Sequence, residues 1–241
     1  MLIHLPDKTF AQMPKFRYTD KTMSKQLGIV FTGGEAPDSK TVRGVIDSLE
    51  ENALTVAADS GLLIAEAAGL VPDWIIGDMD SIGSATDAED HLRLYPVDRI
   101  LRYPAEKDFT DTELALALLR EKGCDEAWII GGGGGRLDHL LGIRDLFERE
   151  YFPRRWITAA EDVHCIDAAV PGNKRLTASL KPGSIVSVLL LGNAPWKAVS
   201  MGLKWQLDNV RWERGLYGLS NVALEDEISI DSQQGRFLII L

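Results

Sequence analysis

Between residues 27 and 150, short runs of apolar residues alternate with longer amphipathic stretches. Within the longer stretches the apolar residues recur three and four positions apart, which is the spacing of one helix face. Strands are predicted at 27–32, 54–58, 74–76, 99–103 and 127–130, and helices at 41–51, 62–70, 86–93, 111–122 and 140–147. Strands that alternate with helices in this way are typical of a parallel sheet covered by helices.

The pattern changes after residue 151, where short apolar runs are separated by turn signals and no long helix is evident. Strands are predicted at 155–160, 163–167, 175–180, 184–191 and 237–241. The turns include Pro171-Gly172-Asn173 and Lys181-Pro182-Gly183. The predicted fold is therefore α/β, with a Rossmann-like parallel sheet domain at 27–152 followed by a smaller all-β sandwich domain at 153–241. Residues 1–26 are interpreted as an N-terminal extension with a short strand at 2–5 and no assigned role.

Composition narrows the function. A chain of 241 residues with 45% hydrophobic content can bury a sizeable core. The formal net charge of −10 argues against general affinity for nucleic acid, which needs a basic face. It does not exclude a nucleotide ligand, because a metal held by carboxylates can carry the phosphates.

Two cysteines are too few for a disulfide framework, so a reducing compartment fits best. No signal peptide and no apolar run of ~20 residues is seen, and we expect a cytoplasmic protein without a membrane span.

Two aspartates follow the predicted strand at 74–76 with one residue between them. In an extended chain the side chains of Asp78 and Asp80 point the same way, which brings two anionic groups together. This arrangement is costly unless a cation lies between them, and Mg²⁺ is the simplest candidate. The alternative is a polar turn in which the aspartates supply only hydrogen bonds.

Other polar or glycine-rich clusters also follow strands. Gly33-Gly34 comes after the first strand, and Asp59-Ser60-Gly61 comes after the second. In an open parallel sheet, ligands bind outside the carboxyl ends of the strands. We therefore expect these clusters to converge on one crevice.

The segment 107–113 has the pattern of a helix start. Thr110 and Glu113 fit a capping box, which places Asp111 in the first helical turn, where the helix dipole favours a carboxylate. Asp108 lies just ahead and can face the same side. Capping alone would explain these residues, but a second acidic group after a second strand favours a functional role.

Five consecutive glycines, residues 131–135, follow the last strand of the first domain and precede a helix. Such a loop can bind phosphate through its backbone N–H groups, although it lacks the ending of a P-loop and the spacing of a dinucleotide fingerprint. Lys107 and Arg136 would add positive charge, and the planar guanidinium of Arg136 suits phosphate oxygens.

Three segments together resemble the thiamine pyrophosphokinase family in their order and spacing. They are Gly77-Asp-Met-Asp-Ser-Ile82, Glu106-Lys-Asp-Phe-Thr-Asp111 and Gly134-Gly-Arg-Leu-Asp-His139. Ala58-Asp-Ser-Gly61 is similar to the Ala-Asp-Gly-Gly turn of that family. Gly202-Leu-Lys-Trp205 and Leu219-Ser-Asn221 are similar to its two C-terminal signatures. The resemblance extends from about residue 27 to the end of the chain.

The resemblance implies a transferase that moves the pyrophosphoryl group of ATP to the hydroxyl of thiamine, giving thiamine diphosphate and AMP. It implies Mg²⁺ as cofactor and a homodimer whose sites are shared between subunits. The implied catalytic residues are Asp78, Asp80, Asp111 and Asp138, the first three of which also bind metal. The implied ATP-binding residues are Gly33, Gly34, Asp59, Lys107, Asp108, Thr110, Gly134, Gly135 and Arg136. The implied thiamine-binding residues are Trp205, Ser220 and Asn221. Which carboxylate accepts the proton of the attacking hydroxyl is left open.

Two positions depart from the family pattern. Gly133 stands where a threonine is frequent, which removes a possible hydroxyl contact to phosphate, and Ser60 stands where a glycine is expected. Trp205 has two interpretations, a core or interface residue, or an aromatic face for the cationic thiamine.

Three rival functions fit part of the same pattern. One is the same transfer to another alcohol such as a pterin, and another is a nucleotide- or thiamine-binding module without turnover. A metal-dependent glycosyltransferase would account for Asp-Met-Asp but for none of the later motifs.

Overall fold

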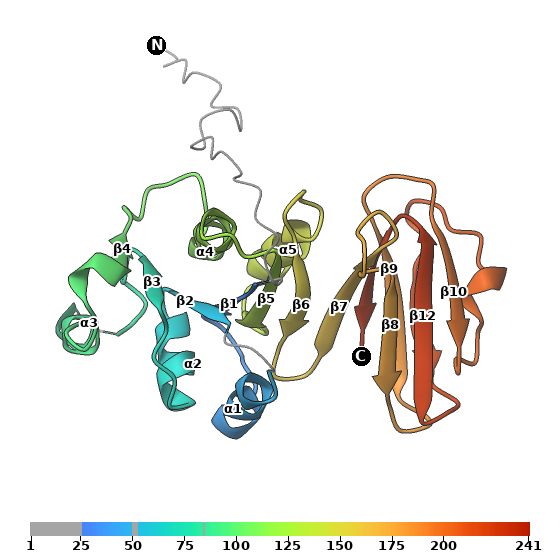
Figure 1. The fold of residues 1–241 in the computed structure, drawn as a ribbon, viewed down its shortest axis with the longest axis horizontal. Coiled ribbons are helices and arrows are strands. Elements are labelled where there is room, and N and C mark those ends of the chain that lie inside the picture. The colour runs from blue at the N-terminus through green and yellow to red at the C-terminus, as the bar shows by residue number, and fades with distance from the viewer. Residues whose placement is uncertain (1–25, 50–52, 84) are drawn as a thin grey trace, which may run out of the picture.

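The computed structural model describes residues 26–49, 53–83 and 85–241. The predicted extension at 1–26 and its strand at 2–5 lie outside the described residues, apart from residue 26. The chain forms an α/β half and a β half that are joined by one continuous sheet (Figure 1). Among the described residues, no helix is both long and apolar enough to cross a bilayer.

The α/β half contains six parallel strands in the order β6-β5-β1-β2-β3-β4. Helices α1 and α2 lie on one face of this sheet, and α4 and α5 lie on the other (Figure 1). The strands are β1 (Leu27–Thr32), β2 (Leu54–Ala58), β3 (Trp74–Gly77), β4 (Ile100–Arg102), β5 (Glu126–Gly131) and β6 (Pro153–Ile157), and the helices are α1 (Ser39–Asp47), α2 (Gly61–Ala67), α3 (Ala85–Leu92), α4 (Asp111–Glu121) and α5 (Leu137–Leu146).

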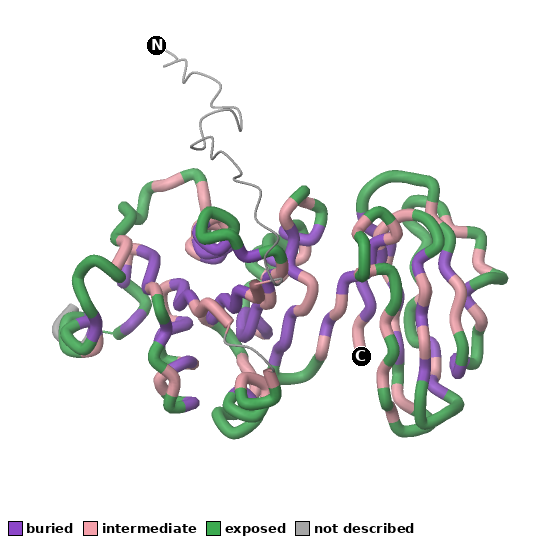
Figure 2. The backbone as a smooth tube through the Cα atoms, viewed as in Figure 1, coloured by how far each residue is buried: buried purple, intermediate pink, exposed green. Residues whose placement is uncertain are grey.

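Strand β1 lies at the centre of this half and is buried on both faces (Figure 2). Ile29 and Phe31 pack with Val42 of α1 on one face, whereas Val30 packs with Leu119 of α4 on the other. A strand covered on both sides by helices needs apolar residues at every position. This requirement explains why its sequence reads as an unbroken apolar run and why its predicted bounds are confirmed.

The β half extends the main sheet with antiparallel strands in the order β11-β9-β13-β7, and a second sheet of order β10-β12-β8 packs against them. Buried Val188 of β9, Ile230 of β12 and Phe237 of β13 belong to the core between the two sheets. The predicted α/β fold followed by a β sandwich is confirmed. The strands are β7 (Asp162–Asp167), β8 (Arg175–Ser179), β9 (Ile185–Leu191), β10 (Lys197–Met201), β11 (Gly218–Val222), β12 (Glu227–Gln234) and β13 (Arg236–Ile240).

The main sheet passes through the predicted domain boundary at 152/153. Strand β6 pairs in parallel with β5, and β7 then pairs antiparallel with β6. The turn between β6 and β7 is held by Thr158, whose hydroxyl accepts hydrogen bonds from the backbone N–H groups of Ala160 and Glu161. The change from parallel to antiparallel pairing therefore falls one strand after the boundary expected from sequence.

Strands β10, β11 and β12 were not predicted. Polar residues occupy inward positions on two of them, which obscures the apolar alternation. Asn221 on β11 and Ser232 on β12 are 3% and 2% exposed, and both have hydrogen-bond partners within the protein. A buried polar side chain is tolerated when it is bonded in this way, but it removes the pattern that identifies a strand.

Candidate functional site

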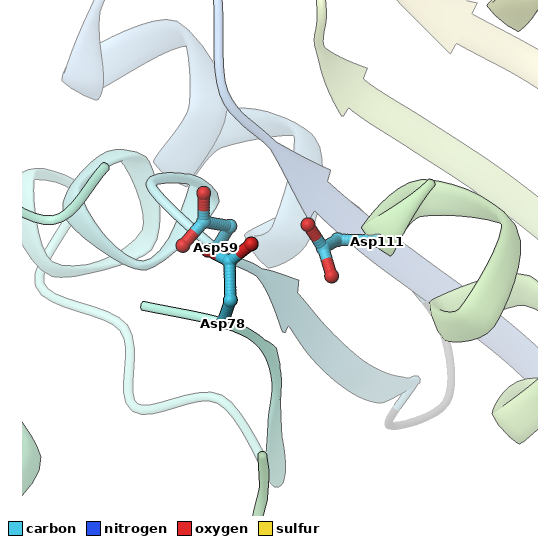
Figure 3. A group of neighbouring side chains, drawn as sticks. All are labelled: Asp59, Asp78 and Asp111. Carbon is cyan, nitrogen blue, oxygen red and sulfur yellow. The ribbon is translucent and has the colours of Figure 1, made fainter. Parts of the chain in front are cut away.

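Three carboxylates meet at the carboxyl ends of the parallel strands (Figure 3). Asp59 directly follows β2, Asp78 directly follows β3, and Asp111 is the first residue of α4. Each side chain is partly buried, and the three offer oxygen atoms that all lie within 4.8 Å of one another. The predicted convergence of clusters that follow neighbouring strands is seen for these residues.

Gly77 lets the three carboxylates approach each other. Its φ is +146°, a conformation that favours glycine. A Cβ atom at this position would lie 3.2 Å from Cγ of Asp111 and 3.2 Å from Cβ of Asp59. Any larger residue at the end of β3 would therefore push these two side chains apart.

The capping box predicted at the start of α4 is confirmed. The backbone N–H of Thr110 donates to Glu113 at 2.6 Å, and the backbone N–H of Glu113 donates to the Thr110 hydroxyl at 3.2 Å. Thr112, the residue after Asp111, has a buried hydroxyl that is hydrogen-bonded to the hydroxyl of Thr32 at 2.7 Å. This bond ties α4 to the end of β1. The helix start that carries Asp111 is thus held by the sheet.

The expected extended geometry of Asp78-Met79-Asp80 is wrong. Met79 has φ +68°, and the backbone N–H of Asp80 donates to Oδ1 of Asp78 at 3.1 Å, so the segment is a tight turn. The turn forms because the Met79 side chain is buried in the core beneath β3, at 4% exposure. Asp80 is exposed and is not one of the three clustered carboxylates.

Backbone strain is concentrated in the two regions that the sequence singled out for ligand binding. Within the described part of the chain, the non-glycine residues with positive φ are Asp59, Met79 and Ser220. Such conformations cost about 1–3 kcal/mol each and persist only where the surroundings impose them. One lies in the carboxylate cluster, one between the two predicted metal ligands, and one in the predicted thiamine signature.

Lys107 lies against two of the carboxylates. Its Nζ is 3.4 Å from Oδ2 of Asp78 and 3.2 Å from Oδ1 of Asp111, and its side chain is only 12% exposed. Burial acts to lower the pKa of Lys107, but the bonds and charges of Asp111 and Asp78 outweigh it and raise this pKa. The ammonium group is therefore charged and held within the acidic cluster.

The two paired carboxylates have opposite pKa shifts. Burial opposes ionisation of Asp78, yet hydrogen bonds from Asp80 and the charge of Lys107 prevail and lower the pKa of Asp78. Burial is the largest influence on Asp111 and raises its pKa despite the contact with Lys107. A bound cation would therefore relieve a greater cost of burial at Asp111 than at Asp78.

The donor set fits a hard divalent cation. Oδ1 of Asp59 is buried and accepts no hydrogen bond, and Oδ1 of Asp111 is buried against the ammonium group of Lys107 at 3.2 Å. Ligand oxygens around one Mg²⁺ are at most about 4.2 Å apart, twice a bond of ~2.1 Å. The separations of up to 4.8 Å in the cluster need only a small inward movement. Asp59, which was predicted to bind ATP, thus stands in this group where Asp80 was expected.

Asp59 could have been identified from the sequence. It is the first residue after a predicted strand, as Asp78 is after the next strand. Because β2 and β3 are neighbouring parallel strands, residues at equivalent ends lie side by side. The signal was therefore the shared position after adjacent strands.

The glycines after β1 and β5 bring two loops together. The backbone N–H of Glu35 donates to the carbonyl of Gly133 at 2.7 Å, and that of Gly133 donates back at 2.9 Å. A Cβ on Gly34 would lie 2.9 Å from the Gly133 carbonyl oxygen, and a Cβ on Gly133 would lie 2.9 Å from Cβ of Thr158. Glycine in place of the frequent threonine at position 133 is therefore explained by close packing against Thr158, directly after β6.

The serine at position 60 also has a steric partner. A Cβ atom on Gly33 would overlap with the Ser60 hydroxyl. The missing side chain at Gly33 thus provides the room that Ser60 occupies, and the loop after β1 is packed tightly against the start of α2.

Arg136 and Asp138 pair with each other at the start of α5. Two guanidinium nitrogens of Arg136 donate to the Asp138 carboxylate at 3.1 and 2.6 Å, and both side chains are exposed. The hydrogen bonds from Arg136 lower the pKa of Asp138. Neither side chain forms an ion pair or hydrogen bond with the three clustered carboxylates among the residues that the structure describes. Asp108 is likewise exposed.

The residues of the predicted thiamine signature meet in the β half. Trp205 is 53% exposed, and Nζ of Lys204 lies 4.6 Å from the centroid of its ring. Asn221 is buried and hydrogen-bonded to the backbone of Trp205, whereas Ser220 is exposed. The exposure of Trp205 removes the interpretation in which its ring is a core residue.

Fold and site together define a class of protein. Its members join an α/β domain, with carboxylates suited to a divalent cation at the strand ends, to a β sandwich through one sheet. Residues 46–155 match the family model for "Thiamin pyrophosphokinase, catalytic domain". The thiamine pyrophosphokinase of Bacillus subtilis is 39% identical over 93 residues. That alignment covers 39% of this chain and 42% of the relative, less than half of its length.

Solved structures extend the similarity over nearly the whole chain. The thiamine pyrophosphokinase structure from Bacillus subtilis has a TM-score of 0.70 at 24% identity, covering 90% of this chain and 98% of the relative. The enzyme from Geobacillus thermodenitrificans has a TM-score of 0.63 at 25% identity, covering 89% and 96%. The yeast enzyme has a TM-score of 0.62 at 16% identity, covering 92% and 87%. In residues 46–155 and in its overall fold, the chain is similar to thiamine pyrophosphokinases.

Proposed function

We propose that this protein transfers the pyrophosphoryl group of ATP to the hydroxyl of thiamine in a Mg²⁺-dependent reaction that gives thiamine diphosphate and AMP. The observation that carries this proposal is the cluster of Asp59, Asp78 and Asp111, whose partly buried carboxylates lie close enough to share one cation, in a chain whose residues 46–155 match the catalytic-domain model. The match to the catalytic-domain model favours thiamine over another alcohol as the acceptor.

The charges at the site explain why a metal is needed. A triphosphate has about four negative charges near neutral pH, and three carboxylates alone would repel it. When bound, Mg²⁺ neutralises charge on the polyphosphate oxygens and orients the transferring group. Asp59, Asp78 and Asp111 would hold this ion, and Asp80 would contact it through water. The chain's own contribution is mainly to position the reactants and to stabilise charge.

Two cationic side chains are available for the phosphates. Lys107 lies on the carboxylates and would turn toward the triphosphate once a metal occupies the cluster. Arg136 is exposed at the start of α5, and its guanidinium can exchange Asp138 for phosphate oxygens of similar geometry. In this proposal Asp138 acts by releasing or orienting Arg136.

The acceptor would bind at Trp205, whose exposed indole face suits the cationic rings of thiamine.

Following the family resemblance, we propose a homodimer in which the carboxylates of one subunit face the Trp205 region of its partner. Large apolar side chains exposed in the β half support an interface there, because such groups are usually covered by a partner. They are Ile185, Met201, Leu216, Tyr217, Leu219 and Leu224.

Two experiments test the proposed function. Incubation with ATP, Mg²⁺ and thiamine should produce AMP and thiamine diphosphate in equal amounts, and no AMP should form after metal chelation. Release of AMP with a pterin alcohol but not with thiamine would contradict the choice of acceptor.

If sites are shared, a mixture of Asp80→Asn and Trp205→Ala proteins should regain activity as subunits exchange. Exchange without recovered activity would argue against shared sites.

The cysteines support a reducing compartment such as the cytoplasm. Cys124 and Cys165 are both free and buried. Burial raises the pKa of the Cys124 thiol to about 11, so this thiol is protonated and unreactive near neutral pH. Neither cysteine has a role in the proposed chemistry.

A further inference from the structure

Two segments that are separate in sequence form a short antiparallel ribbon in the β half. The backbone N–H of Leu224 donates to the carbonyl of Gly202 at 2.8 Å, and that of Lys204 donates to the carbonyl of Val222 at 2.9 Å. Leu203 and Ala223 form the bridge between these bonds. The ribbon runs toward Trp205 on one side and toward Asn221 on the other.

The ribbon meets an irregularity in β11 at this point. Gly218 pairs with Val188 and Asn221 pairs with Val186, so β11 contains one more residue than β9 over this stretch. Ser220 lies in this bulge with φ +56°, and its backbone N–H donates to the Ser187 hydroxyl at 3.1 Å. A bulge redirects side chains and interrupts the regular ladder of backbone hydrogen bonds.

The side chain of Asn221 continues the ribbon where backbone pairing ends. The N–H of Trp205 donates to Oδ1 of Asn221 at 3.1 Å, and Nδ2 of Asn221 donates to the carbonyl of Trp205 at 2.7 Å. Oδ1 also accepts from the N–H of Val222 at 2.8 Å. Because the backbone provides one donor and one acceptor at Trp205, the orientation of the amide is unambiguous.

These contacts leave Asn221 little capacity for a ligand. Both acceptor positions of Oδ1 and one hydrogen of Nδ2 are used, and the residue is 3% exposed. Trp205, by contrast, has its backbone fixed on both sides while its ring is 53% exposed. The amide therefore holds the part of the chain from which the indole projects.

We propose that Asn221 is a positioning residue that acts on thiamine only through Trp205. It fixes the backbone of Trp205 so that the indole face is presented to the cationic rings, and it makes no contact with thiamine itself. The inference rests on the proposed function, since it takes thiamine as the acceptor. It changes the role that the family resemblance implied for Asn221, from ligand contact to support of a ligand contact.

A double-mutant cycle tests this proposal, because residues that act through one another are not additive. Thiamine and ATP affinities are measured by calorimetry on the wild type, Asn221→Ala, Trp205→Ala and the double variant, together with thermal midpoints. We expect Asn221→Ala to weaken thiamine binding about 3- to 30-fold with ATP affinity unchanged. In the Trp205→Ala background, the same change should weaken thiamine binding by less than about twofold.

Ser232→Ala is the matched control. Ser232 is buried in the same sandwich and donates to the carbonyl of Gly235 at 2.7 Å, so its loss should lower the thermal midpoint without changing thiamine affinity. If Asn221→Ala does not fold, Asn221→Ser leaves a smaller gap and takes its place in the cycle.

The outcomes separate this inference from the proposed function. Equal losses of thiamine affinity from the Asn221 change in both backgrounds would show a direct contact and overturn the inference. Unchanged thiamine affinity in the single Asn221 variant would overturn it as well. Failure of the wild-type protein to bind thiamine would instead overturn the proposed function.

Discussion

The carboxylate cluster and the Trp205 region each hold a lysine where the proposed function requires a different cation. Lys107 lies between Asp78 and Asp111 in the α/β half, and its side chain is 12% exposed. Lys204 lies over the ring of Trp205 in the β half and is exposed to solvent. In both regions the proposed ligand, a divalent metal or the rings of thiamine, must compete with an ammonium group of the protein.

The difference between the two lysines lies in how firmly each is held. A partly buried ammonium between two carboxylates is less screened than an exposed one and interacts more strongly. An exposed cation–π contact contributes only about 0.5–1 kcal/mol. Displacing Lys107 therefore calls for a doubly charged ion and its phosphates, whereas a singly charged aromatic cation suffices to displace Lys204.

The largest effect is expected in the carboxylate cluster. Asp59→Asn and Asp111→Asn should each reduce turnover about a hundredfold or more, the scale observed when one charge-stabilising group is removed from an active site. Each change deletes a charge that the metal requires, and neutral asparagine binds Mg²⁺ poorly. Steady-state AMP formation at saturating Mg²⁺ is the measurement.

Asp90→Asn is the control for these variants, since Asp90 is an exposed acid that pairs with Arg93 away from the cluster. It should retain wild-type turnover. Near-normal activity of Asp59→Asn would remove Asp59 from the metal set and restore Asp80 as the better third ligand.

The second effect concerns the aromatic face. Trp205→Ala should weaken thiamine binding by about 1–3 kcal/mol, or roughly 5- to 150-fold, through loss of stacking and cation–π contacts. Trp205→Phe should recover part of this loss, and ATP affinity should be unchanged in both. Calorimetric titration of each ligand checks these expectations.

Trp128→Ala is the matched control for Trp205. Trp128 also has a guanidinium over its ring, that of Arg155 at 4.9 Å, but it lies on β5 in the α/β half. Its loss should lower the thermal midpoint and leave thiamine affinity unaltered. If Trp205→Ala gave the same result as Trp128→Ala, Trp205 would have no role in acceptor binding.

The third effect tests Lys107 as an internal counter-ion. Lys107→Met should tighten binding of Mn²⁺ to the nucleotide-free protein by about fivefold or more, because the metal no longer has to displace an ammonium group held between two carboxylates. The added metal should also raise the thermal midpoint of Lys107→Met more than that of the wild type. Turnover should fall, since a cationic partner for phosphate is lost.

Electron paramagnetic resonance of free Mn²⁺ measures this affinity directly. Lys40→Met is a suitable control because Lys40 is an exposed lysine on α1. Weaker Mn²⁺ binding in Lys107→Met would mean that Lys107 organises the carboxylates instead of competing with the metal.

The smallest effect is expected at Lys204. Lys204→Met should tighten thiamine binding about two- to fivefold, since the exposed cation–π contact that competes for the indole is worth only about 0.5–1 kcal/mol. Competition predicts that this gain disappears in the Trp205→Ala background. A loss of thiamine affinity in Lys204→Met would indicate that the lysine assists binding by another route.

Much of the fold could be predicted because its strands are buried on two faces. An unbroken apolar run such as Ile29 to Phe31 identifies a central strand without knowledge of its neighbours. Strands β10, β11 and β12 of the sandwich could not be identified in this way. Asn221 and Ser232 are buried yet polar, and only the hydrogen bonds that they make in the folded chain explain their positions.

The site shows the same division between local and tertiary information. The capping box of Thr110 and Glu113 depends on residues three positions apart, so the sequence by itself determined it and, with it, the position of Asp111 at a helix start. The membership of Asp59 in the carboxylate cluster depends on the pairing of β2 with β3 and on the absence of a side chain at Gly77. The role of Asn221 depends on a contact with a residue 16 positions away. Local hydrogen bonds and apolar runs are properties of residues that are neighbours in sequence. Distances between side chains that are far apart in sequence are set only when the strands pair.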